Sequence, residues 1–189
     1  YPLDTDKPEM LKGIEPSRLV ELAFFAPQWM ELVREHLKWK GFNEAYYYFV
    51  AHTKESDSEA KRAQIALYTD LAPEDLADGA FDARLFNEAF KLVGKKNFAL
   101  FYDAAKYMGS SNYHSRARRF ADVTQGLIQE TELYEQIDKT RNKDALCALG
   151  LVPLPKSKVD TALLKRYKRI QAFLKESKQF GAQRQTSEK

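Results

Sequence analysis

The residues best placed to do chemistry lie where a flexible connection over 109–111 runs into a basic helix. Asn112 is a suitable first residue for that helix, and His114, Arg116 and Arg119 follow it. The first turn of a helix leaves unpaired N–H donors, and Arg116 and Arg119 lie one turn apart, so this group could hold a phosphate or a carboxylate. An ordinary turn with solvated arginines is the alternative, because no nucleotide-binding glycine pattern is present.

A second basic group lies in the last part of the chain. Residues 156–189 carry ten lysines and arginines against three acids, a net charge of +7, which leaves −4 for the rest. Lys165, Lys168, Arg169 and Lys175 are predicted to lie on the side of the final helix opposite its apolar residues, where each could neutralise a nucleic-acid phosphate. A solvated helix face is the favoured interpretation, because no base-stacking side chains are interleaved with these residues.

Metal and nucleophile patterns are weak in this sequence. The histidines are widely separated, the single cysteine Cys147 is flanked by apolar residues, and the acids over 70–82 lack the alternation of a calcium loop. Acids at those positions are typical of helix starts, and Cys147 is expected to be a buried apolar side chain. We therefore predict no catalytic residues, no metal and no cofactor.

Apolar residues recur at spacings of three and four almost everywhere, which predicts an all-α fold. About ten short helices are expected in an irregular array, and stacked helical pairs of the HEAT or armadillo kind are one form of it. The only strand-like passage, 46–50, has no partner strand and is interpreted as helix. Asp82 is predicted to cap the clearest helix of the first half, and Gly94 to end it.

Two prolines at 153 and 155 mark the strongest boundary, because a helix cannot contain both. We predict a helical domain over 1–155 and a long basic helix over 156–189 that packs on it as one structural unit. Leu163, Tyr167, Ile170 and Leu174 form a heptad-like seam, which is expected to pack on neighbouring helices of the same domain.

The stretch 166–188 is the most distinctive part of the sequence, in particular Phe173 to Gly181 followed by Gln183 and Arg184. It resembles a segment of very large bacterial proteins of unknown function that are labelled molybdate-metabolism regulators. The opening from Leu11 to Trp29 is similar to the helical region of the same proteins, which commonly carry a WGR module beside it. This resemblance implies an interior fragment of a multidomain cytosolic protein and supplies no reaction.

The longest apolar run, 45–51, is far shorter than a membrane span, so no contact with a membrane is expected. The chain begins at Tyr1 and not at Met, which suggests an excised piece of a longer cytoplasmic polypeptide. The leading hypothesis is a non-catalytic scaffold or protein-interaction domain, whose partners are other domains of the parent protein or another protein. The alternative is nucleic-acid or phosphate-ligand binding, and the oligomeric state is left open.

Overall fold

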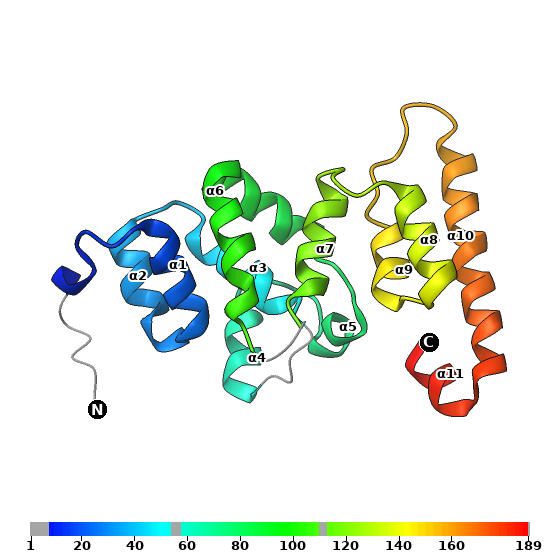
Figure 1. Cartoon of the computed structure of the whole chain (residues 1–189), viewed down its shortest axis with the longest axis horizontal. Coiled ribbons are helices and arrows are strands. Elements are labelled where there is room, and N and C mark those ends of the chain that lie inside the picture. Colours follow the sequence, from blue (N-terminus) through cyan, green and yellow to red (C-terminus); the bar gives the residue numbers. More distant parts are fainter. Residues whose placement is uncertain (1–7, 54–57, 110–112, 189) are drawn as a thin grey trace. The chain divides into compact units, whose positions relative to one another are not determined.

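The computed structural model describes residues 8–53, 58–109 and 113–188, which are helical and contain no strand (Figure 1). The all-α prediction is confirmed, and residues 46–50 lie inside a helix. The chain divides into two compact units, Tyr1–Arg118 (unit 1) and Arg119–Lys189 (unit 2). Whether the helices stack as HEAT or armadillo pairs stays a prediction.

The helices of unit 1 are α1 (Pro16–Phe25), α2 (Met30–Leu37), α3 (Phe42–Ala51), α4 (Glu59–Ile65), α5 (Pro73–Asp78), α6 (Ala83–Ala104) and the start of α7 (Ser115–Thr124). Short 3-10 turns cover Pro8–Leu11, Pro27–Trp29 and Ala105–Tyr107. As predicted, the Asp82 carboxylate caps α6 by accepting a hydrogen bond from the Leu85 N–H at 2.9 Å. The backbone leaves the helical conformation at Gly94, so α6 consists of two segments joined at that glycine.

Helix α3 forms the centre of unit 1, and its aromatic side chains pack against α6. The ring of Phe49 lies 5.4 Å from that of Phe98 and 4.9 Å from that of Tyr48. The Tyr48 hydroxyl donates to the Ala117 carbonyl at 2.8 Å, which satisfies a polar group inside this core. A Cβ atom at Gly41 would overlap the Leu92 side chain, so only glycine allows α3 to begin this close to α6.

Unit 2 contains the rest of α7, then α8 (Glu130–Thr140), α9 (Lys143–Leu149), α10 (Val159–Glu176), a 3-10 turn over Ser177–Phe180 and α11 (Ala182–Glu188). Its apolar core is small and includes Leu133, Ile137, Leu149 and Phe173, all fully buried. The turn with Pro153 and Pro155 lies inside unit 2, between α9 and α10.

The C-terminal region differs from the predicted single helix over 156–189. Helix α10 ends at Glu176, and Gly181 has a φ of 88°, a conformation that favours glycine and separates α11 from the preceding turn. The Ser177 hydroxyl donates to the Leu174 carbonyl at 2.6 Å and satisfies one of the free carbonyls at the end of α10. The basic segment is therefore a helix, a turn and a second short helix.

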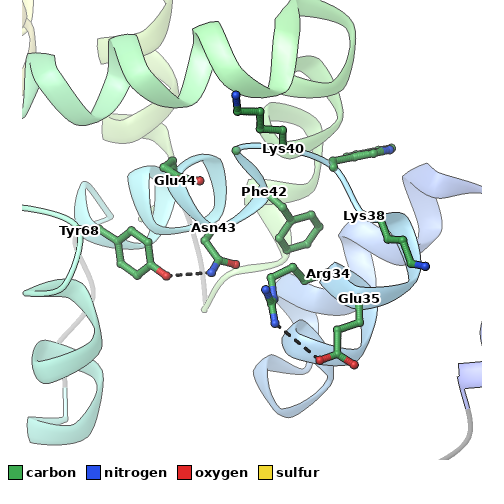
Figure 2. A pocket seen from close by; sticks show the side chains of 10 residues that line it. Arg34, Glu35, Lys38, Lys40, Phe42, Asn43, Glu44 and Tyr68 are labelled. Carbon is green, nitrogen blue, oxygen red and sulfur yellow. Dashed lines mark hydrogen bonds and ion pairs between the residues drawn. The ribbon is translucent and has the colours of Figure 1, made fainter.

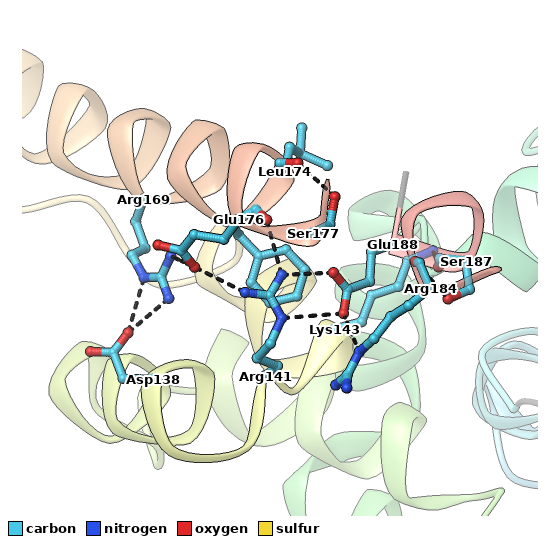
Figure 3. Close-up of polar contacts among 11 residues, drawn as sticks. Asp138, Arg141, Lys143, Arg169, Leu174, Glu176, Ser177, Arg184, Ser187 and Glu188 are labelled. Atoms are coloured by element: carbon cyan, nitrogen blue, oxygen red, sulfur yellow. Dashed lines mark hydrogen bonds and ion pairs between the residues drawn. The ribbon is translucent and has the colours of Figure 1, made fainter. Parts of the chain in front are cut away.

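Arg141, the residue that ends α8, binds the C-terminal elements of unit 2 (Figure 3). Its guanidinium donates to the Glu176 carboxylate at 2.9 Å, to the Glu188 carboxylate at 2.7 Å and to the Phe173 carbonyl at 3.0 Å. It also lies 4.2 Å from the centre of the Phe173 ring. Glu188 is the only buried residue of α11, so polar contacts hold this helix in place.

Candidate functional site

The predicted anion-binding group on α7 serves contacts inside the protein. Asn112 lies outside the described residues. Arg116 is only 4% exposed and donates to the carbonyls of Leu76 and Ala77 at 3.0 and 2.9 Å. These carbonyls belong to the last turn of α5, where a helix leaves its acceptors free. Arg116 therefore closes the end of α5.

The other two members of that group have different surroundings. Arg119 donates to the Asn142 side chain at 2.9 Å, and that side chain also caps α9. His114 is half-buried, and burial together with the Arg118 charge lowers its pKa below the usual 6.5. Arg116 and Arg119 are thus each engaged with a different helix end, and an anion site at this place stays a prediction.

The predicted basic residues of α10 do not form one free surface. The Lys165 ammonium lies 4.4 Å from the centre of the Tyr134 ring and 3.7 Å from the Glu130 carboxylate. Arg169 contacts the Asp138 carboxylate at 2.8 Å and the Glu176 carboxylate at 3.6 Å. Lys168 is exposed and has no ion pair within the described part of the chain. The charges of Lys165 and Arg169 are therefore used to attach α10 to its own unit.

Sequence reasoning missed Arg166, which lies at the centre of this attachment. Its side chain is 5% exposed and donates to the Glu130 carboxylate at 2.9 Å and to the Val152 carbonyl at 2.8 Å. Arg166, Arg169 and Phe173 are spaced by three and four residues, so they share the face that α10 turns toward unit 2. That spacing could have indicated that Arg166 lies on the buried face of the helix, although arginine is mostly an exposed residue type.

The apolar seam of α10 is correspondingly on the solvent side. Leu163 is 46% exposed, Leu164 52% and Tyr167 59%, while Ile170 and Leu174 are half-buried. The prediction that this seam packs inside its own domain is wrong, because the arginines and Phe173 occupy the buried face. We call these five residues the α10 stripe.

A pocket of about 820 Å³ lies in unit 1 between α2 and α3 (Figure 2). Its lining combines aromatic rings with charges of both signs and comprises Arg34, Glu35, Lys38, Trp39, Lys40, Gly41, Phe42, Asn43, Glu44 and Tyr68. The Asn43 amide donates to the Tyr68 hydroxyl at 2.8 Å, and Arg34 already pairs with Glu31 at 2.7 Å. Since the lining carries both cations and carboxylates, it selects no single ligand charge.

His52 is a strongly perturbed titratable group inside unit 1. Its Nδ1–H donates to the Tyr48 carbonyl at 2.8 Å, and its Nε2 accepts from the Asp82 backbone N–H at 3.0 Å. Burial lowers its pKa to about 4, so the ring is neutral at pH 7. Both ring nitrogens are used for structure, and neither is open to a substrate proton.

The histidines, the cysteine and the acids of the described ranges are dispersed over the fold. No group of three or more histidines, cysteines or acids lies close enough to hold a metal ion among the residues described. Cys147 is half-buried, whereas the sequence predicted a buried side chain. No helix over 8–53, 58–109 or 113–188 combines the length and the hydropathy needed to cross a bilayer.

Comparison with known proteins gives one match. A family model described as "Family of unknown function (DUF5724)" matches residues 1–189. No curated protein and no solved structure is similar enough to count as a match. The family description mentions neither molybdate nor a WGR module, so the resemblance noted in the sequence stays a prediction.

Proposed function

The chain belongs to DUF5724, a family of unknown function, and from its own residues we propose that it is a non-catalytic helical domain that binds another protein segment. The partner is a separate protein or another domain of the same polypeptide. This proposal keeps the leading interpretation of the sequence and moves its basis to a specific surface.

The observation that carries the proposal is the exposure of the α10 stripe. Leu163, Leu164 and Tyr167 are neighbours on one helix face, and each leaves about half of its side chain in water. Fully burying an apolar side chain of this size is worth about 1.5 to 3 kcal/mol, so a partner that covered the exposed half of each would gain about half of that per residue. Contiguous apolar patches of this kind mark interaction sites on soluble proteins.

The nucleic-acid alternative has less support. Arg116, Arg166 and Arg169 each already donate to a carbonyl or a carboxylate of the protein. Counterion release requires cations that are free to face phosphates. Lys168 and Lys175 are the predicted nucleic-acid residues on α10 that have no carboxylate partner among the described residues.

The test places a photo-crosslinking amino acid at position 167, in the polypeptide that carries this chain in its own cells. The same amino acid at Lys95, an exposed site on α6, is the matched control. We expect a discrete crosslinked segment from position 167 and none from position 95. Equal crosslinking from both positions, or none from position 167, would rule out the proposed function.

A further inference from the structure

We infer that the segment bound by the α10 stripe is an amphipathic helix that carries acidic residues beside its apolar face. This inference rests on the proposed function and specifies the chemistry of the partner. It combines the spacing of the apolar residues with the placement of two unpaired lysines.

The spacing of the stripe suits another helix. Leu163, Tyr167, Ile170 and Leu174 are separated by four, three and four residues, which is the heptad pattern of a coiled-coil seam. At 1.5 Å per residue the seam is about 17 Å long, or three helical turns. A helix of similar length with the same pattern can insert its side chains between these at a crossing angle of about 20°.

The charges beside the stripe are positive and uncompensated. Lys168 follows Leu164 by four residues and Lys175 follows Lys168 by seven, so both lie along the edge of the stripe that Leu164 forms. Both are exposed, and neither forms an ion pair within the part of the chain that the structure describes. The nearby arginines differ, since Arg166 and Arg169 meet carboxylates of α8 at 2.9 and 2.8 Å.

The charges beside the stripe favour an acidic partner helix over an anionic membrane and over nucleic acid. The two lysines are seven residues apart, so acids at positions i and i+7 of a partner helix can face both of them. Stable attachment to an anionic membrane takes about four to eight basic residues, more than this face supplies. Nucleic acid would leave Leu163 and Leu164 in water, because their side chains offer neither charge nor a flat ring.

The test uses two synthetic helical peptides about three heptads long, both with leucine at the seam positions. One carries glutamate at the flanking positions and the other carries lysine. Binding to the 189-residue chain is measured by fluorescence anisotropy at low salt. We expect the glutamate peptide to bind at least about tenfold more tightly, and the Lys168→Glu/Lys175→Glu variant to reverse this preference.

A Lys95→Glu/Lys96→Glu variant is the matched control, because it makes the same charge change on an exposed part of α6. It should keep the preference for the glutamate peptide. Far-UV circular dichroism and urea unfolding check that both variants retain their fold. Equal binding of the two peptides, or no binding of either, would overturn the inference.

The outcomes of crosslinking at position 167 and of binding to other anionic partners separate this inference from the proposed function. If position 167 gives a discrete crosslink whose yield is unchanged by Lys168→Glu/Lys175→Glu, the acidic helix is wrong and the interaction surface stands. If position 167 gives no crosslink, both fail. Binding of anionic vesicles or duplex DNA that depends on these two lysines, without a preference between the peptides, would also overturn the acidic helix.

Discussion

Unit 1 and unit 2 are stabilised in different ways. The core of unit 1 is built from aromatic rings, and Phe24, Tyr48, Phe49, Phe98 and Phe101 are all buried and in ring contact with one another or with other rings. Unit 2 has fewer large apolar side chains, and arginine–carboxylate pairs attach α10 and α11 to α8. Apolar burial depends little on salt and pH, whereas ion pairs depend on both. The two units should therefore respond differently to the same conditions.

The largest effect is expected from Phe49→Ala in the aromatic core. Its ring is fully buried and lies within 6.2 Å of the Phe24 ring and 5.4 Å of the Phe98 ring. Removing a buried aromatic ring costs about 3 to 5 kcal/mol of unfolding free energy. Urea unfolding measures this loss, with Phe25→Ala, at a side chain 74% exposed, as the control. Similar losses for the two variants would contradict the aromatic core.

The next largest effect is expected from Arg141→Gln in unit 2. This change removes one of the two arginines that contact Glu188 and leaves it Arg184 at 2.9 Å, and losing the hydrogen bonds of the less exposed arginine should cost about 2 to 3 kcal/mol. Hydrogen exchange should show α11 opening while the amides of α3 stay protected. Arg18→Gln removes an exposed pair at 2.7 Å, which solvent screens, and should leave the stability nearly unchanged. If the amides of α11 keep their protection from hydrogen exchange in the Arg141→Gln variant, Arg141 does not hold this helix in place.

The third largest effect is expected on acidification. Between pH 7 and pH 5 the unfolding free energy should fall by about 2 kcal/mol, because His52 becomes protonated in the unfolded chain. Its pKa is about 4 in the folded chain and near 6.5 in the unfolded chain, so the unfolded state takes up the proton first. The stability that the fold gains from its neutral His52 ring is fully present above pH 6.5 and is lost as the pH falls toward 4. His52→Gln should remove most of this slope, and the lowered pKa of His114 should leave a smaller remainder. Urea unfolding at several pH values provides the measurement.

The smallest effect is expected from Tyr167→Ser on the α10 stripe. Because this side chain is 59% exposed, the unfolding free energy should change by less than about 0.5 kcal/mol. Phe173→Ser, on the buried face of the same helix, should cost several kcal/mol. Thermal unfolding of the two variants compares the faces directly. A large loss for Tyr167→Ser would show that the stripe belongs to the core of unit 2.

The sequence predicted the helices well because their signals are local. The cap at Asp82 and the interruption at Gly94 depend on neighbouring residues, and both are seen in the structure. The helical state of 46–50 followed from the lack of a partner strand.

The roles of the arginines could not be predicted in this way. Arg166 depends on Glu130, and Arg116 depends on carbonyls of α5, which lie 36 and about 40 residues earlier in the chain. Hydrophobic spacing treats every arginine as solvated, and so it assigned the apolar stripe to the core. The buried face of α10 was missed because charge pairing, and not apolar content, decides its orientation.

The position of Glu188 has a consequence for the order in which the chain folds during synthesis. The aromatic core of unit 1, with the Ala117 carbonyl that accepts from Tyr48, needs only residues up to 117, whereas the Arg141 guanidinium has a partner 47 positions later. A ribosome that has released Arg141 must still add all of α10 before Glu176 can pair with it, and all of α11 before Glu188 can. Unit 1 can thus complete its interior while unit 2 is still waiting for its last helix.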